Sequence, residues 1–340
     1  MTEPTQSPLL TPMAVVGAGS WGTALAIHCA RTGHPTRLWG RDASLIGAMR
    51  RDRRNARYLP DAPFPAGLAV VAELREALDG ARDVLIAVPS NAFRVTLERL
   101  SPELDPGARI AWASKGFETS SGLLPHQVAG EVLGPRPGAV LSGPTFAREV
   151  GAGLPTAMTI ASRDSGFAEE LALRLSGPQF RAYTQSDIAG VEVGGAVKNV
   201  IAIGTGIADG MGFGSNTRVA LITRGLAEMM RLGLKLGARR ETFMGLAALG
   251  DLVLTCTDDQ SRNRRLGLAL GRGGEIEQAL RGIGQVVEGV TAAIAVRNVA
   301  ERLGADMPIC REVYRIMHEA RPVRAALSAL MGREVRSETE

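Results

Sequence analysis

The chain has 340 residues, more than one ordinary domain and about the length of two. Apolar residues make up 45% of it and charged residues 22%, which supplies a packed core and excludes a disordered or fibrous protein. The net charge is only +4 and aromatic residues are 4%, so few rings could stack on bases and we expect no nucleic-acid partner.

The first half alternates short apolar runs with amphipathic segments. We predict strands at 13–16, 36–39, 68–71, 84–88, 109–113, 139–141 and 157–161. Helical patterns lie between most of them, at 23–30, 92–100 and 168–175. This alternation is typical of a doubly wound parallel sheet with helices on both faces, so the predicted fold class is α/β.

The β-type runs stop after about Asp187, and the rest of the chain has helical periodicity. We predict helices at 191–207, 219–236, 241–254, 262–270, 290–303 and 309–317. The predicted domains are therefore a nucleotide-binding α/β domain at 1–187 and an all-α domain at 188–340.

Cysteine and histidine are too scattered to form a disulfide framework or a metal site. The three cysteines are odd in number and include no Cys-x-x-Cys pair, which favours a reducing compartment. The N-terminal twelve residues do not resemble a signal peptide, and no stretch reaches the ~18 uncharged apolar residues of a membrane span. We expect a cytoplasmic protein that binds no metal and does not insert into a membrane.

The run Gly17-Ala-Gly19-Ser-Trp-Gly22 matches the pattern G-x-G-x-x-G. Glycine is so common in this chain that the pattern alone is weak evidence, but here it directly follows the first predicted strand and opens the first helix. In that context Gly17 permits a tight turn, Gly19 allows close approach of a pyrophosphate, and Gly22 lets the helix pack on the strand. The run predicts a dinucleotide site.

The second predicted strand ends at Trp39-Gly40-Arg41-Asp42, about 20 residues beyond the glycine run. An acidic residue closing this strand would bind the ribose 2′-hydroxyl of NAD. In this chain Arg41 precedes the acidic Asp42, which favours NADP as the cofactor. Asp42 leaves NAD as a possible cofactor.

Only three of the 39 basic residues are lysine, namely Lys115, Lys198 and Lys235. A guanidinium does not release a proton near neutral pH, whereas an ammonium can do so when its surroundings lower its pKa. Lys235 at a helix end suits a solvated role, and Lys115 follows a strand at the edge where ligands of open α/β sheets bind. Lys198 lies among apolar and small residues, where a charge is costly without a partner or a task.

Two further segments are rich in hydrogen-bond donors. Ser261-Arg262-Asn263 stands at a predicted helix start, where cations are unfavourable unless an anion is present, and it suits a phosphate monoester. The alternative to a phosphate site is an ordinary helix start that Ser261 caps and whose basic first turn is solvated. The loop from Ser142 to Thr145 follows another strand. The glycines at 204, 206, 210, 212 and 214 have two interpretations. They allow close approach of the cofactor domain or form a hinge, or they serve tight helix packing.

Several long stretches resemble the bacterial NAD(P)-dependent sn-glycerol-3-phosphate dehydrogenases, from about Met13 to about Glu334. They are GAGSWGTALA, RYLPD, ASKGFE, LSGPTFAREV, VEVGGAVKNVIAIGTGIADG, NTRVALITRGLAEM, TFMGLAALGDLVLTCTDDQSRNRR and IGQVVEG. The resemblance implies a Rossmann-type domain followed by a helical substrate domain. It also implies reversible hydride transfer between NAD(P)H and dihydroxyacetone phosphate, which yields sn-glycerol 3-phosphate for phospholipid synthesis.

The resemblance also implies positions for the site residues. Besides the three glycines, it places around the cofactor Ser20, Trp21, Arg41, Tyr58, Lys115, Ala147, Arg262, Val286 and Glu288. It places around the substrate Lys115, Gly143, Thr145, Lys198, Asp251, Ser261, Arg262 and Asn263. Lys198 would be the proton acceptor in glycerol phosphate oxidation, Asp251 would hold it, and Lys115 would add positive potential. We expect NADP somewhat more than NAD.

Two other functions remain open at this point. A dehydrogenase of the β-hydroxyacid type would need carboxylate-binding residues where this chain has Ser261, Arg262 and Asn263. A non-catalytic NADPH sensor would bind the nucleotide without oxidising it, and Lys198 would be dispensable. The partner we expect is a small phosphorylated substrate, and a homodimer is left open.

Overall fold

The computed structural model describes residues 11–332. Residues 1–10, most of the segment that we expect not to be a signal peptide, and residues 333–340 lie outside the described range. The chain divides into two compact units, each described by itself below. Unit 1 comprises the chain up to Glu118 and Leu123–Glu192, and unit 2 comprises Thr119–Gly122 and the chain from Val193 on. The domain boundary between 187 and 188 stays a prediction.

Unit 1 is built on an eight-stranded sheet whose order is β10-β9-β8-β7-β6-β1-β2-β5. Its strands are β1 (Met13–Val16), β2 (Thr36–Trp39), β5 (Leu68–Val71), β6 (Asp83–Ile86), β7 (Arg109–Trp112), β8 (Gly138–Ser142), β9 (Thr156–Ser162) and β10 (Phe180–Gln185). β1, β6 and β7 are buried along their whole length, as expected for central strands covered on both faces. The sheet confirms the predicted Rossmann-type fold class.

One pair of strands in this otherwise parallel sheet is antiparallel. β8 and β9 pair antiparallel, with Val140 opposite Ala161, while β10 pairs parallel with β9. The connection from β8 to β9 contains only the six-residue helix α6 (Ala147–Ala152). After α6 the chain turns back beside the strand that it has just left.

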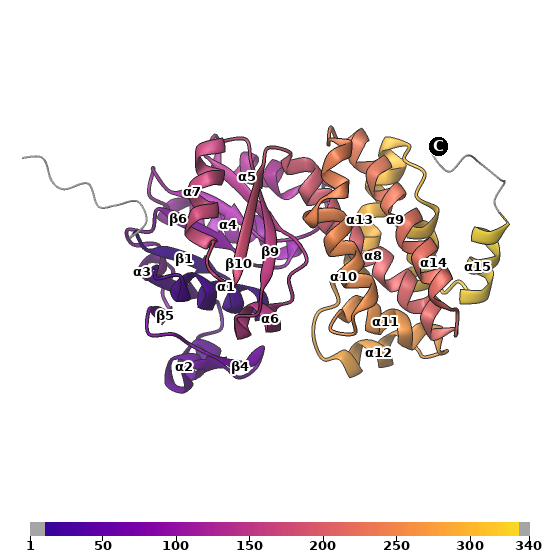
Figure 1. Ribbon diagram of the computed structural model, residues 1–340, viewed down its shortest axis with the longest axis horizontal. Helices are drawn as coiled ribbons and strands as arrows, with labels where there is room; N and C mark the ends of the chain where they lie inside the picture. Colours follow the sequence, from indigo (N-terminus) through magenta and orange to yellow (C-terminus); the bar gives the residue numbers. More distant parts are fainter. Residues whose placement is uncertain (1–10, 333–340) are drawn as a thin grey trace, which may run out of the picture. The chain divides into compact units, whose positions relative to one another are not determined.

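The helices of unit 1 flank the sheet (Figure 1). Besides α6 they are α1 (Ser20–Arg31), α2 (Ala43–Asp52), α3 (Leu74–Leu78), α4 (Phe93–Leu100), α5 (Pro125–Leu133) and α7 (Ser165–Leu175). One core cluster joins α1, α7 and the sheet, with Leu25, Ile27, Leu85 and Leu171 essentially inaccessible to solvent. A small antiparallel pair, β3 (Arg54–Asn55) and β4 (Leu59–Pro63), follows α2. Sequence periodicity did not reveal this pair, which is too short to carry a period of its own.

Unit 2 is helical, as predicted. Its helices are α8 (Ile188–Gly210, which begins in unit 1), α9 (Ser215–Lys235), α10 (Asp251–Thr257), α11 (Arg262–Gly271), α12 (Ile276–Ile283), α13 (Glu288–Leu303), α14 (Pro308–His318) and α15 (Val323–Met331). By length and composition α8 could cross a membrane, but 89% of its most apolar 18-residue window is buried inside the protein. That burial is typical of a core helix.

The single helix predicted for residues 241–254 is wrong. The structure has a 3₁₀ segment at Arg240–Met244, an extended Gly245, a π-type turn at Leu246–Gly250 and only then α10. Gly245 has φ −92° and ψ −177°, which ends the first segment. The π-type turn leads directly into Asp251, and turns of this kind often lie at functional sites.

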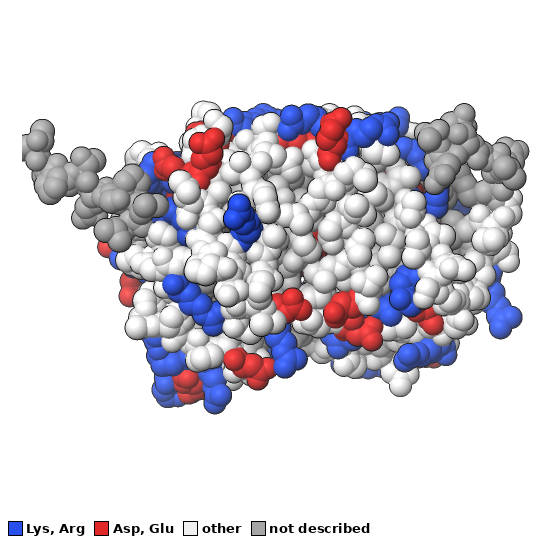
Figure 2. Space-filling model, viewed as in Figure 1, with Lys and Arg blue, Asp and Glu red and all other residues white. Residues whose placement is uncertain are grey.

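The described residues carry charges of both signs on the surface (Figure 2) and three cysteines in the interior. Positive and negative side chains are interspersed on the face that Figure 2 shows. Cys29, Cys256 and Cys310 are buried free thiols, and burial raises the pKa of Cys29 and Cys256 to about 12. Within residues 11–332, no group of three His, Cys, Asp or Glu side chains is placed to hold a metal ion.

Glycines let α8 and α11 cross with their backbones in contact. A Cβ on Gly206 would lie 2.3 Å from the carbonyl oxygen of Arg264, and one on Gly210 would lie 2.5 Å from that of Leu268. The opposing helix has the reciprocal arrangement, since a Cβ on Gly267 would lie 2.2 Å from the carbonyl oxygen of Ile203. These glycines therefore serve tight helix packing within unit 2.

We expect Gly206→Ala to lower the free energy of unfolding of unit 2 by about 1 to 3 kcal/mol, because the new methyl group forces the two backbones apart. Gly282→Ala is the matched control, since a Cβ at this helical glycine meets nothing within 4 Å. The control should be neutral or more stable by up to about 1 kcal/mol. Urea unfolding followed by circular dichroism measures both, and equal midpoints for the two variants would contradict the packing role.

A buried carboxylate fixes the start of α14. Glu228 on α9 accepts hydrogen bonds from the backbone N–H groups of Ile309 (2.6 Å) and Cys310 (3.1 Å). Burial raises the pKa of Glu228 to about 7, although these amide donors act in the opposite direction. The first turn of α14 is therefore held by a group that titrates close to neutral pH.

This shift makes stability depend on pH in a defined direction. Between the ordinary glutamate value of 4.5 and about 7, the folded chain keeps a proton on Glu228 that the unfolded chain has lost. The free energy of unfolding should therefore fall by about 3 kcal/mol from roughly pH 5 to pH 8 through this group. Glu228→Gln cannot titrate, so its unfolding free energy should decline less over the same range; parallel pH profiles would refute the assignment.

Candidate functional site

The glycine run of unit 1 forms the tight connection from β1 to α1. Gly17 has φ +119°, and a Cβ there would lie 2.5 Å from the carbonyl oxygen of Ala87. A Cβ on Gly22 would lie 1.8 Å from the carbonyl oxygen of Gly17, so neither position accepts a larger residue. A Cβ on Gly19 would meet nothing within 4 Å, which leaves open space beside the start of α1.

The surroundings of this loop fit a dinucleotide. The loop lies where β1 has β2 on one side and β6 on the other, the switch point at which open α/β sheets bind ligands. The first turn of α1 has no side-chain cap and no acidic residue, so its amide groups and helix dipole suit a pyrophosphate. Trp21 Nε1 is buried and has no hydrogen-bond partner among the described residues, and a bound ligand could supply the acceptor.

A residue outside the sequence prediction holds this loop in place. Asn55 on β3 is fully buried, and its Nδ2 donates to the carbonyl oxygen of Ala18 (3.0 Å) and to Thr23 Oγ1 (2.8 Å). Its Oδ1 accepts from the backbone N–H of Tyr58 at 3.2 Å. The short β3–β4 pair therefore ties predicted cofactor residue Tyr58 to the glycine loop.

Arg41 and Asp42 follow β2 with different surroundings. Asp42 caps α2: its Oδ1 accepts from the backbone N–H groups of Ser44 and Leu45, both at 3.1 Å, and from Ser44 Oγ at 2.7 Å. These bonds, Ser44 Oγ first, lower the pKa of Asp42. Arg41 is exposed. Asp42, the carboxylate that made NAD a possible cofactor, therefore caps α2, while the guanidinium of Arg41 is accessible.

Three predicted residues of unit 1 follow the carboxyl ends of neighbouring strands. Lys115 comes after β7, where Ser114 Oγ donates to the carbonyl oxygen of Val88 at 2.6 Å. Gly143 comes after β8 with φ +154°, and a Cβ there would lie 3.0 Å from Met158 Cα. Thr145 Oγ1 donates to the carbonyl oxygen of Gly143 at 3.3 Å. Because β7 and β8 are parallel, these groups share one edge of the sheet.

The central feature of unit 2 is a buried lysine with two polar partners. Lys198 on α8 is 8% exposed, and its Nζ lies 2.5 Å from Asp251 Oδ1 and 3.0 Å from Thr255 Oγ1. Thr255 Oγ1 in turn donates to the backbone carbonyl oxygen of Asp251 at 2.6 Å. Asp251 and Thr255 are also buried. The predicted pair of Lys198 and Asp251 is brought together, and Thr255 is a partner that the sequence reasoning missed.

Close packing of α8 on the π-type turn brings this cluster together. A Cβ on Gly194, one helical turn before Lys198, would lie 2.8 Å from the carbonyl oxygen of Ala247. Ala247 belongs to the turn that leads into Asp251 and α10. The absence of a side chain at Gly194 therefore lets Asp251 reach the lysine.

The segment Ser261-Arg262-Asn263 opens α11, as predicted. Ser261 Oγ accepts from the backbone N–H of Arg264 at 3.2 Å and so caps the helix. Arg262 is half-buried, whereas Arg264 is buried and its guanidinium pairs with Asp209 and, at 2.9 Å, with Asp259. The basic first turn is thus divided between a buried structural arginine and a more accessible Arg262.

The side chain of Asn263 is engaged with neighbours of Lys198. Its Nδ2 donates to Asn199 Oδ1 at 2.9 Å, and its Oδ1 accepts from the backbone N–H of Gly289 at 2.8 Å. Asn199 Nδ2 lies 3.3 Å from Glu288 Oε2. Asn199, also missed from sequence, links Asn263 and Glu288 to the residue that follows Lys198.

The remaining predicted cofactor residues are Ser20 and Ala147 in unit 1 and Val286 in unit 2. Ser20 and Ala147 begin α1 and α6 of unit 1. Val286 precedes α13 of unit 2 and is 61% exposed, with no role in the packing of that unit. The sequence-predicted cofactor residues therefore come from both units, and the predicted substrate residues do so as well.

Fold and site define a Rossmann-type NAD(P)-binding protein with a buried lysine in a separate helical unit. Two family models match the chain: the N-terminal model of NAD-dependent glycerol-3-phosphate dehydrogenase covers residues 12–168, and the C-terminal model covers residues 187–328. The chain belongs to the NAD-dependent glycerol-3-phosphate dehydrogenase family.

Individual relatives agree with this assignment. The glycerol-3-phosphate dehydrogenase [NAD(P)+] of Thioalkalivibrio sulfidiphilus is 56% identical over 96% of this chain and 98% of its own length. The protein of the same name from Edwardsiella ictaluri is 53% identical over 99% of each chain. The crystal structure of the glycerol-3-phosphate dehydrogenase of Coxiella burnetii is similar with a TM-score of 0.93 and 48% identity, and it covers 96% of this chain and 100% of its own.

Proposed function

We propose that this protein is an NAD(P)-dependent sn-glycerol-3-phosphate dehydrogenase that reversibly reduces dihydroxyacetone phosphate. The observation that carries the proposal is the buried Lys198, held by Asp251 and Thr255, in a chain whose other unit has the features of a dinucleotide site. The product, sn-glycerol 3-phosphate, would serve glycerophospholipid synthesis. We further propose a cytoplasmic location.

NAD(P)H, when bound, supplies the hydride, and the protein supplies orientation, charge and a proton. In the reducing direction Lys198 Nζ gives a proton to the carbonyl oxygen of the substrate as it gains negative charge. In the oxidising direction the neutral amine accepts the hydroxyl proton. A positioned acid or base of this kind is typically worth about 10²- to 10⁴-fold in rate.

Asp251 and Thr255 fix the lysine for this role. The Lys198 ammonium lies 2.5 Å from Asp251 Oδ1 and 3.0 Å from Thr255 Oγ1, and these two contacts orient it. Asp251 also balances the buried charge, which would otherwise be costly. We propose that Lys115 adds positive potential at the carbonyl.

The phosphate of the substrate would be held by the start of α11. Arg262 supplies a guanidinium suited to a phosphate, and the first amide groups of the helix add further donors. The amide of Asn263 is occupied by Asn199 and Gly289, so its side chain serves to position the helix start, and its backbone N–H is the group offered to the anion. Binding here orients the carbonyl for reaction.

The arrangement favours NADP at the adenosine end of the cofactor. Asp42, the candidate for the ribose 2′-hydroxyl, is engaged as the cap of α2, whereas Arg41 is exposed and available to a 2′-phosphate. The residues proposed for the remaining cofactor contacts are Ser20, Trp21, Tyr58, Lys115, Ala147, Arg262, Val286 and Glu288.

Lys198→Met should bind NADPH normally and lose at least about 10²-fold in kcat, because the variant keeps the side-chain volume but has no proton to transfer. Lys235→Met is the matched control, since it removes an exposed lysine from the same unit and should retain full activity. Turnover by the Lys198 variant at the normal rate would refute the proton role.

Arg262→Gln should raise the KM for dihydroxyacetone phosphate by about 10- to 100-fold, as expected for loss of a charged hydrogen bond to phosphate. Arg265→Gln removes an exposed arginine three residues further along α11 and should leave KM unchanged. The alternative, a β-hydroxyacid-type dehydrogenase, predicts no difference between the two variants and no preference for a phosphorylated ketone. Steady-state kinetics with each variant decides between them.

A further inference from the structure

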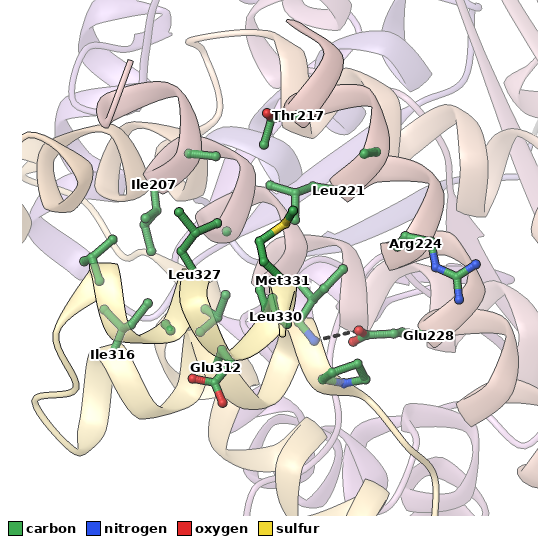
Figure 3. A pocket seen from close by; sticks show the side chains of 18 of the residues that line it. Ile207, Thr217, Leu221, Arg224, Glu228, Glu312, Ile316, Leu327, Leu330 and Met331 are labelled. Carbon is green, nitrogen blue, oxygen red and sulfur yellow. Dashed lines mark hydrogen bonds between the residues drawn. The ribbon is translucent and has the colours of Figure 1, made fainter. Parts of the chain in front are cut away.

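The last two turns of α8 have two faces with different neighbours. One face lines an apolar cavity of about 730 Å³ among α8, α9, α14 and α15, where Figure 3 shows Ile207 and, from α9, Leu221. The other face carries Gly206 and Gly210, which contact the backbone of α11. Asp209 is three residues after Gly206, so it belongs to the face that meets α11. Side chains that line a cavity pack against no protein atoms on that side, so this end of α8 depends on its contacts with α11 and α9.

The carboxylate of Asp209 accepts hydrogen bonds from two arginines, and its side chain is 7% exposed. Arg218, near the start of α9, places its Nε 3.1 Å from Oδ1 and 2.9 Å from Oδ2. Arg264, in the first turn of α11, donates to Oδ2 through a terminal guanidinium nitrogen. A carboxylate at a helix C-terminus is unfavourable by itself, and so is a guanidinium near a helix N-terminus. The three charges therefore stabilise one another where three helix ends meet.

Arg264 makes further contacts that fix the start of α11. Its Nε donates to Asp259 Oδ1 at 2.9 Å, and its backbone N–H donates to Ser261 Oγ at 3.2 Å. The loop that leads into the helix is thus connected to Arg264 at two places, and Arg264 is connected to α8 through Asp209. Because the side chain of Asp259 is exposed, Asp209 is the partner shielded from solvent, and it determines where the buried guanidinium lies.

Arg262 is half-buried and lies two residues before Arg264, which places it on nearly the opposite side of α11. The contacts of Arg264 therefore fix the helix from one side and leave Arg262 to face the other. We propose that Asp209 is a positioning residue for the phosphate of the substrate. By holding Arg264, it sets the orientation in which Arg262 and the first amide groups of α11 meet that anion. This inference rests on the proposed function, because it takes the substrate phosphate to bind at the start of α11.

Asp209→Asn tests this role with two substrates that differ only in the phosphate group. The amide keeps the volume of the carboxylate but not its charge, so Arg264 is held less firmly. We expect kcat/KM for dihydroxyacetone phosphate to fall about tenfold, the effect of weakening a charged hydrogen bond, while kcat/KM for unphosphorylated dihydroxyacetone stays within about twofold. An equal fall with both substrates would indicate a structural role only and overturn the proposal.

Binding of inorganic phosphate tests the same role without turnover. Isothermal titration of the full chain should show a phosphate site that Arg262→Gln weakens about tenfold, which identifies it as the start of α11. Asp209→Asn should weaken the same site about tenfold. Unchanged affinity in Asp209→Asn, or the absence of a phosphate site sensitive to Arg262→Gln, would overturn the proposal. A parent that binds phosphate there and leaves dihydroxyacetone phosphate unreduced would contradict the proposed function alone.

Arg218→Gln is the matched control, because it removes the other partner of Asp209 and leaves the contact with Arg264. It should lower the urea midpoint of unfolding and leave phosphate affinity unchanged. Arg264→Gln leaves Asp209 paired with Arg218, and it should weaken phosphate binding as Asp209→Asn does; it carries the test if circular dichroism shows that Asp209→Asn is unfolded. Adding Asp209→Asn to Arg264→Gln should weaken binding no further, because both changes remove one interaction. Equal loss of phosphate affinity in Arg218→Gln, unchanged affinity in Arg264→Gln, or additive losses in the double variant would overturn the assignment.

Discussion

The ion pair between Lys198 and Asp251 is the constraint around which unit 2 is arranged. Lys198 is 8% exposed, so its ammonium needs a partner, and Asp251 Oδ1 at 2.5 Å provides it. The partner can come so close only because Gly194 lets α8 touch the π-type turn before Asp251. A buried ion pair is a weak source of stability by itself. Its presence in this position is explained better by chemistry than by folding.

Each unit contributes its own kind of order to the proposed function. In unit 1, glycines and Asn55 fix a backbone loop with open space beside a helix start, which suits a phosphate-containing ligand. In unit 2, side chains on α8, α10 and α11 fix a proton-bearing amine and a guanidinium. Tight contacts such as that between Gly206 and α11 make this second frame rigid, and a rigid frame keeps catalytic groups oriented at little cost.

The features that could be predicted from sequence are those that depend on local pattern or on a rare residue type. The glycine run, the helical second half and Lys198, one of three lysines, fall in this group. Contacts between distant segments carry no local signal, which is why Thr255, Asn199 and Asn55 were missed. The same applies to the antiparallel β9, whose direction depends on its pairing with β8. It applies also to the helix break at Gly245, where apolar periodicity continues through a residue that is extended in the fold.

The most direct test follows the reduced-nicotinamide absorbance of the purified protein with dihydroxyacetone phosphate, with NADPH and NADH in separate reactions. The account predicts that NADPH is consumed in equal amount to sn-glycerol 3-phosphate formed, faster than NADH, and that unphosphorylated dihydroxyacetone reacts far more slowly. Absence of cofactor oxidation, or equal rates with and without the phosphate group, would contradict it.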